Sequence, residues 1–157
     1  MDIQQAQALS HTTVEIAASS LPHAVVTYLV EEKMWHLEQT YKHQDGATLI
    51  TVPQGFRFDL ASVPRIIWWL VSPFELSIVA PLVHDFLYLH KGDPPAGAID
   101  PPRRYTRKAS DQLFKRIMKK EGVGWWRWRI AYAAVRAFGG ASWGTDSVTD
   151  TISPPHS

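Results

Sequence analysis

A histidine and an aspartate stand side by side in the most apolar run of the chain. His84 and Asp85 lie within Val79–Leu89, where Tyr88 is the only other residue with a polar side chain. An unpaired buried charge commonly costs several kcal/mol, so both groups are expected to be hydrogen-bonded, to bind an ion or to face a cavity. On a helix His84 and Tyr88 share a face, whereas Asp85 points about 100° round from His84. The sequence therefore predicts different partners for the histidine and the neighbouring carboxylate.

A second carboxylate is predicted to meet His84 from another helix. Within the helical pattern Arg107–Glu121, Asp111 lies at the edge of the apolar stripe. If this helix packs antiparallel on the one that bears His84, Asp111 can reach one nitrogen of the imidazole, the one that does not take part in the reaction. A carboxylate there fixes the tautomer of a neutral histidine and leaves the other nitrogen for a water molecule. This is a general-base arrangement for hydrolysis, with His84 and Asp111 as the catalytic pair.

Asp85 is then free to hold a hard cation. We expect Ca²⁺, completed by loop carbonyls and water, because this ion prefers oxygen ligands. The cation would polarise a carbonyl or phosphoryl oxygen of the substrate.

Structural roles stay open for the same residues. His84 and Asp85 could form a structural pair that bridges neighbouring backbone, because polar networks also occur in protein cores. Asp111 could form a surface ion pair with Arg107 or Lys115, which lie one helical turn away on either side.

Composition limits the classes of function. The 157 residues include 16 Lys and Arg and 15 Asp and Glu, and the net charge of +1 gives no electrostatic argument for a nucleic-acid partner. Because the chain has no cysteine, a metal ion would need histidine, carboxylate or carbonyl ligands. The N-terminus lacks the pattern of a signal peptide, and no stretch reaches the ~18 apolar residues of a transmembrane segment. We expect a cytoplasmic protein with no cofactor other than Ca²⁺.

The length suits one domain with loose ends. Residues 1–20 are polar and rich in Ser, Thr and Gln, and are expected to form an irregular or flexible arm or an edge element. Residues 21–143 are predicted to form the single globular domain. Residues 144–157 are small and polar, and are predicted to be disordered.

The fold is predicted to be α+β, with a small N-terminal antiparallel β-sheet on a mainly α-helical core. Runs rich in Val, Thr and Tyr predict strands at His23–Val30, Met34–Tyr41 and Ala47–Val52, and Asp45-Gly46 is a hairpin turn signal. The four prolines of Gly92–Arg103 predict an exposed irregular loop between the two packed helices that bear His84 and Asp111.

Capping signals place the ends of these helices. The first begins near Leu76 with a kink at Pro81, or begins at Pro81 itself. The second runs from Arg107 to Glu121, with Thr106 as N-cap and Gly122 as the C-terminal stop. A last helix is predicted from Val123 to Phe138 and ends at Gly139-Gly140.

A short helix is also predicted at Ile66–Val71, with Pro64 in its first turn and Ser62 as N-cap. Asp59 is interpreted either as part of this capping device or as an additional metal ligand beside Asp85.

Tryptophans interleave with arginines in the last helix. Trp125, Trp126 and Trp128 alternate with Arg127 and Arg129, as in helices that lie at a membrane surface. Aromatic residues at helical spacing are more often core or subunit contacts, so we favour that interpretation here and also for the pair Trp68 and Trp69.

Three segments together resemble a domain-of-unknown-function family that is frequent in tailed phages and prophages. These segments are Gly55–Arg65 (GFRFDLASVPR), His84–Tyr88 (HDFLY) and Ser110–Phe114 (SDQLF). The resemblance implies a phage or prophage origin, and a location in the cytoplasm of the infected or lysogenic host or in the virion. The partners it implies are phage structural proteins or further copies of the chain.

A second resemblance is to the phospholipase A2 superfamily, in which one helix carries His-Asp-x-x-Tyr and a facing helix carries Asp with Phe three residues later. His84, Asp85, Tyr88, Asp111 and Phe114 match this pattern. The resemblance implies that His84 activates water, that Asp85 binds calcium, that Asp111 pairs with His84, and that Tyr88 donates a hydrogen bond to Asp111. The glycine-rich calcium loop and the disulfides of that superfamily are absent, and Phe58–Ser62 stands in roughly the place of the loop.

Three hypotheses of function follow. The first is a phage-associated hydrolase that uses His84 and Asp111 as base and orienting group and acts on a lipid ester. The second is a non-enzymatic virion or assembly component whose polar core specifies packing. The third is a metal-dependent phosphohydrolase, since His-Asp doublets also occur in that chemistry.

Overall fold

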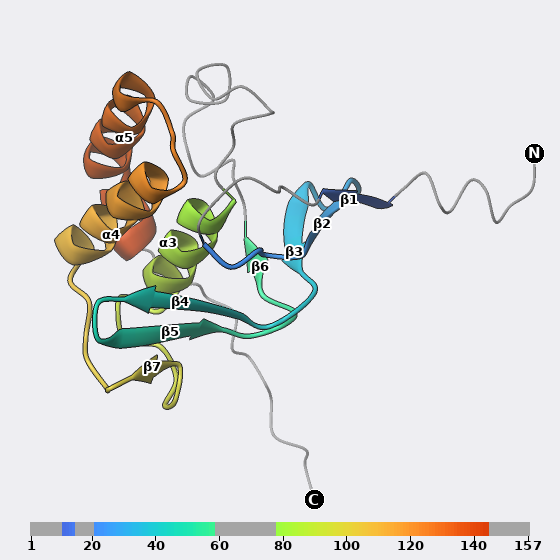
Figure 1. The fold of residues 1–157 in the computed structure, drawn as a ribbon, viewed down its shortest axis with the longest axis horizontal. Helices are drawn as coiled ribbons and strands as arrows, with labels where there is room; N and C mark the ends of the chain where they lie inside the picture. The colour runs from blue at the N-terminus through green and yellow to red at the C-terminus, as the bar shows by residue number, and fades with distance from the viewer. Residues whose placement is uncertain (1–10, 15–20, 59–77, 145–157) are drawn as a thin grey trace, which may run out of the picture.

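A computed structural model describes residues 11–14, 21–58 and 78–144. Strands fill the N-terminal half of this part and three helices pack together in the C-terminal half, so the predicted α+β class is confirmed (Figure 1). The short helix predicted at Ile66–Val71, together with Asp59 and Ser62, lies outside the described residues, as does the tail from residue 145 onward.

The strands form two sheets rather than the single predicted one. The first has the antiparallel order β1-β2-β3-β6, and the second has the antiparallel order β4-β5-β7. The strands of the first sheet are β1 (His11–Val14), β2 (Val26–Leu29), β3 (Met34–Leu37) and β6 (Arg57–Phe58). Those of the second are β4 (Tyr41–Asp45), β5 (Thr48–Val52) and β7 (Ile99–Asp100).

The strand predicted at Met34–Tyr41 is divided between the two sheets. β3 ends at Leu37, whose backbone N–H donates to the carbonyl oxygen of Phe56 at 2.9 Å, and β4 begins only at Tyr41. Alternation of side chains shows which residues face inward but not where a chain changes its pairing partner, so this break was not visible in the pattern. The Asp45-Gly46 turn is confirmed, with Gly46 at a φ of 61°.

The proline-rich loop also contains a strand that was not predicted. Ile99 and Asp100 form β7, which pairs with Leu49 and Ile50 at the edge of β5. Ile99 is buried, so one apolar side chain anchors the loop to the sheet in spite of its prolines. A strand of only two residues fits between the prolines. Prolines are tolerated beside it because an edge strand forms hydrogen bonds on only one side.

The helices are α3 (Val79–Leu89), α4 (Arg107–Lys120) and α5 (Trp125–Gly144). α3 begins at neither of the predicted positions. Pro81 falls within its first turn, where the missing N–H is not needed. The Thr106 hydroxyl accepts from the backbone N–H of Ala109 at 3.1 Å, which confirms the predicted N-cap of α4. Gly122 has a φ of 77° just beyond that helix, as expected of a C-terminal stop.

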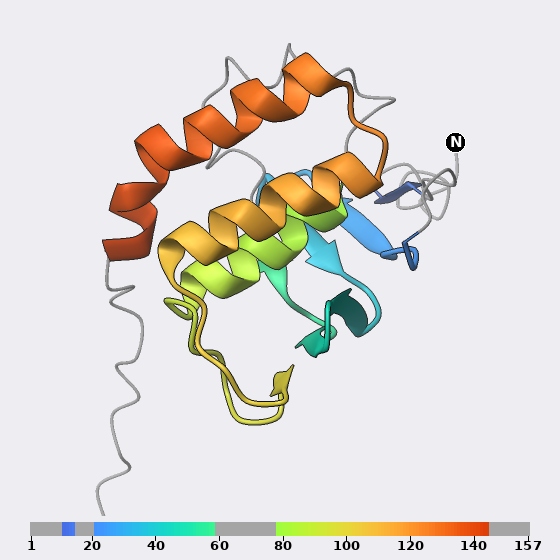
Figure 2. The ribbon, with the colours of Figure 1, turned by 60° about the vertical axis from the view of Figure 1, so that its left-hand side comes forward.

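α3 and α4 pack side by side, and α3 lies between the strands and the other two helices (Figures 1 and 2). The core follows from this position, because nearly every side chain of α3 is buried. The ring of Phe86 meets Phe56 edge to face with centroids 5.4 Å apart, which ties α3 to the first sheet. Asp45 accepts hydrogen bonds from Tyr105 and Arg116, both at 2.9 Å, which ties the second sheet to α4.

α5 is longer than predicted, because Gly139 and Gly140 lie within it. At Gly139 an added Cβ would lie 2.7 Å from the Tyr88 hydroxyl oxygen, so the glycine permits close packing of α5 on α3. Gly139 therefore serves helix packing, and neither glycine ends the helix. None of the described helices combines the length and the hydropathy that crossing a bilayer requires.

Candidate functional site

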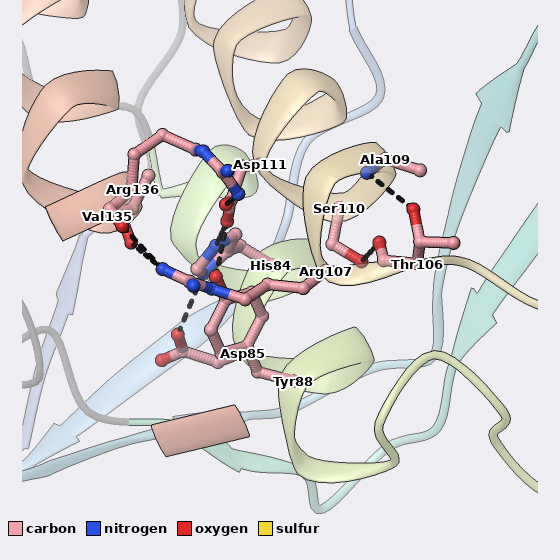
Figure 3. Close-up of polar contacts among 10 residues, drawn as sticks. All are labelled: His84, Asp85, Tyr88, Thr106, Arg107, Ala109, Ser110, Asp111, Val135 and Arg136. Atoms are coloured by element: carbon pink, nitrogen blue, oxygen red, sulfur yellow. Dashed lines mark hydrogen bonds and ion pairs between the residues drawn. The ribbon is translucent and has the colours of Figure 1, made fainter. Parts of the chain in front are cut away.

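The centre of the candidate site is the fully buried carboxylate of Asp111 on α4. Its Oδ1 atom lies 3.0 Å from Nε2 of His84 and also accepts a hydrogen bond from the Tyr88 hydroxyl. Its Oδ2 atom accepts from the Arg136 guanidinium of α5 at 2.8 Å. Figure 3 shows these groups converging from all three helices. The structure thus brings together the three residues predicted to be catalytic, and adds an arginine.

α3 presents His84 and Tyr88 on one face, as the four-residue spacing predicted. Their rings lie 4.0 Å apart between centroids, and the His84 ring lies 5.0 Å from that of Phe114. Tyr88 is held in turn by the edge-to-face ring of Trp143 at 4.9 Å. The imidazole is therefore fixed by aromatic packing as well as by hydrogen bonding.

Asp85 lies on the other side of the same imidazole. Its Oδ1 atom is 3.6 Å from Nδ1 of His84, and 22% of its side chain is exposed. His84 therefore contacts both carboxylates, and the pair with Asp85 that the sequence left open as a structural alternative is formed. The angle between successive Cα–Cβ bonds does not fix the end of a flexible side chain, which can bend back toward the preceding residue.

The described residues do not by themselves fit a calcium site. Ca²⁺ takes about six to eight oxygen ligands, and Asp85 is the one predicted ligand that the structure describes. The other, Asp59, lies outside the described residues. Among the residues that are described, no group of three or more His, Cys, Asp and Glu side chains is arranged to hold a metal ion.

Electrostatics favour a charged pair at the centre of the site. Burial alone would lower the pKa of His84, but hydrogen bonds to Asp111 and Asp85 outweigh it, and the net pKa is raised. Burial alone would raise the pKa of Asp111, but hydrogen bonds from His84, Tyr88 and Arg136 outweigh it, and the net pKa is lowered. The two shifts are opposite in direction, and each favours the charged form of its group, so together they describe an imidazolium held by carboxylates.

The surface ion pairs considered for Asp111 are not formed. Arg107 instead donates to the backbone carbonyl oxygens of Val135 at 3.3 Å and Arg136 at 2.5 Å. Lys115 lies over the ring of Tyr132, with its ammonium 4.8 Å from the centroid. Both side chains hold α5 against α4, and Asp111 faces the interior.

Arg136 is the member of the site that sequence reasoning missed. It lies in the last helix, 25 residues from Asp111, and nothing in the spacing indicates which face of α5 meets α4. An arginine in an otherwise uncharged stretch of that helix is the one signal that could have drawn attention to it.

The arrangement permits two uses. A buried carboxylate that holds one imidazole nitrogen leaves the other nitrogen to accept a proton, as a general base does. The same contacts also satisfy every buried charge in the cluster, as a structural network does.

Comparison with known proteins adds a family but no activity. The family model "Protein of unknown function (DUF1353)" matches residues 35–135, which run from β3 to the middle of α5. No curated protein and no solved structure matches the chain.

Proposed function

We propose that the chain, which belongs to the DUF1353 family, hydrolyses a carboxylic ester with His84 as general base and Asp111 as the group that orients it. The observation that carries the proposal is the fully buried Asp111 carboxylate, 3.0 Å from Nε2 of His84. This contact leaves Nδ1 on the side of the ring where Asp85 is partly exposed.

Each step assigns the proton to a named atom. The base is the neutral form of His84, which exists above the raised pKa of the imidazole. In that form the hydrogen on Nε2 is donated to Asp111, so Nδ1 carries the free electron pair. Nδ1 takes a proton from a water molecule, whose oxygen attacks the ester carbonyl and forms a tetrahedral intermediate. The proton then passes from Nδ1 to the departing alkoxide, and His84 returns to its neutral form. The carboxylates of Asp111 and Asp85 stabilise the imidazolium that exists between these two transfers.

Two features support an ester of a lipid as substrate. The contacts of His84, Tyr88 and Asp111 resemble those expected for a phospholipase A2-like core. In addition, Leu89 lies one helical turn beyond Asp85 on α3 and is 55% exposed, so an apolar side chain stands beside the partly exposed carboxylate. The proposal retains the phage or prophage origin that the first resemblance implied.

The test is fatty-acid release from mixed phospholipids and from a soluble short-chain ester, each measured with Ca²⁺ and with a chelator. Wild type is compared with His84→Gln, and His90→Gln serves as a matched control at the end of the same helix. We expect hydrolysis by wild type and the control, with loss of about a hundredfold or more in His84→Gln if a general base is removed. Circular dichroism checks that each variant is folded. No release from either substrate by folded wild type would refute the ester hydrolase.

The calcium arm tests the predicted metal-binding role of Asp85, and of a site that Asp59 would complete, separately from the base pair. Activity that needs Ca²⁺ and is lost in Asp85→Asn would support a metal site completed by residues outside the described part. Activity that persists in the chelator would remove calcium from the proposal and leave the base pair intact.

A second candidate function is a non-enzymatic virion or assembly component. It is favoured by the position of His84, whose two ring nitrogens both face carboxylates of the same chain. It predicts that His84→Gln lowers stability without a catalytic phenotype, and that the protein copurifies with tail or capsid particles. The metal-dependent phosphohydrolase, in contrast, predicts a bound transition metal in the purified protein.

A further inference from the structure

The outward face of α5 is apolar along much of its length. Trp125 is 68% exposed, Phe138 is 63% exposed, and Trp126 and Ile130 are each 41% exposed. α5 contains no acidic residue, and its inner side packs on α4 and α3. In both ribbon views the opposite side of α5 turns away from the other described elements (Figures 1 and 2). A helix that is apolar both toward the core and toward the outside is expected to have something covering its outer face.

The structure divides the tryptophans of α5 between the core and the surface. Trp128 packs against the core, in agreement with the interpretation favoured from the sequence. Trp125 and Trp126 do not, because both are among the exposed large side chains. The pair Trp68 and Trp69 lies outside the described residues.

Cations lie beside the three indoles at the start of α5. The guanidinium of Arg127 lies 5.2 Å from the ring centroid of Trp126, and that of Arg129 lies 5.8 Å from the centroid of Trp125. From α4, the ammonium of Lys119 lies 4.7 Å from the centroid of Trp128. These contacts are within the range of cation–π attraction. They keep positive charge beside apolar surface, so the occupant should offer both negative charge and an apolar layer.

We propose that this surface, defined by Trp125, Trp126, Arg129 and Lys119 and called here the tryptophan corner, docks on a phospholipid bilayer that contains anionic headgroups. Indole rings favour the boundary between headgroups and acyl chains, and arginine and lysine are attracted to anionic lipids at the same depth. A second copy of the chain is disfavoured as the occupant because a symmetric contact through this corner would bring like charges together. The inference rests on the surfaces of α4 and α5 alone and is independent of the proposed hydrolysis.

The test is co-sedimentation with vesicles of ether-linked phosphatidylcholine, with and without ether-linked phosphatidylglycerol. Ether lipids have no ester bond, so binding is measured without hydrolysis, and failure to bind is distinguishable from failure to hydrolyse. We expect wild type to bind the vesicles that contain phosphatidylglycerol, and binding to weaken as salt is added. Each cation removed, as in Lys119→Gln or Arg129→Gln, should weaken binding roughly fivefold.

The double variant Trp125→Ser/Trp126→Ser should bind at least tenfold more weakly than wild type. Val30→Ser is the matched control, because Val30 is 60% exposed, directly follows β2 and lies outside the corner. Equal binding by the double variant and the control would overturn the proposal, as would no binding of wild type to anionic vesicles. Two further results would also overturn it: a concentration-dependent dimer abolished by the double variant, or binding to single-stranded RNA at salt concentrations where vesicles are not bound.

Discussion

Two adjacent glycines in α5 allow the packing of that helix on α3 to be tested with a single chemical change. An added Cβ at Gly139 would lie 2.7 Å from the hydroxyl oxygen of Tyr88 and 3.1 Å from its Cε1 atom. An added Cβ at Gly140 would meet nothing nearer than a guanidinium nitrogen of Arg107, at 3.4 Å. Tyr88 cannot easily yield, because its hydroxyl donates to Asp111 and its ring is packed against Trp143.

Replacing glycine by alanine within a helix raises the free energy of unfolding by about 1 kcal/mol. Gly140→Ala should gain up to about that amount. Gly139→Ala gains the same helix propensity but adds an overpacking cost of about 1–3 kcal/mol. The second variant should therefore be less stable than the first by about 1–3 kcal/mol, or several degrees in Tm.

Urea unfolding followed by circular dichroism measures this difference. Because both variants make the same substitution one residue apart, the comparison cancels the propensity term. Combining Gly139→Ala with Tyr88→Phe should recover part of the loss, since the nearest atom is then absent. If both alanine variants gain stability equally, α5 does not pack on Tyr88 as described, and the position of Arg136 beside Asp111 would fall with it.

Three further predictions concern the described contacts. Asp111→Asn should cost about 3 kcal/mol or more in urea unfolding, because it leaves buried donors without their anion, and a change below about 0.5 kcal/mol would contradict the network. Thr106→Ala should lose about 1 kcal/mol from the N-cap of α4, whereas Thr106→Ser keeps the accepting oxygen and should stay near wild type. Burial lowers the pKa of His43 to about 4 from 6.5. The unfolded chain therefore binds more protons between these pH values, and wild type should lose on the order of 3 kcal/mol relative to His43→Leu as pH falls from 6.5 to 4. Parallel pH curves for the two proteins would show that His43 is not buried in its neutral form.

The sequence predicted the site better than the sheets. His84, Tyr88 and Asp111 could be placed together because helical periodicity fixes which face each occupies, and a surface loop between two helices favours antiparallel packing. The break between β3 and β4 could not be predicted, because pairing partners depend on distant strands such as β6. Membership of an uncharacterised family was predicted and is confirmed by the match.

The wrong helix end at Gly139 and the role that the sequence left open for Asp85 have the same physical origin. A glycine pair ends many helices, but the sequence does not show that a tyrosine on another helix occupies the space where a Cβ would be. Nor does the sequence show that the flexible side chain of Asp85 bends back toward His84. In both cases the deciding contact is between side chains, and local pattern carries no information about it.

Arg136 has a practical consequence for how the domain is delimited. The family match ends at residue 135, so a chain trimmed to that match would keep His84, Tyr88 and Asp111 but lose the guanidinium that binds Oδ2 of Asp111. It would also lose Gly139 and Trp143, which confine the Tyr88 ring. The smallest fragment worth expressing or grafting onto another scaffold therefore extends to Gly144, the last residue of α5.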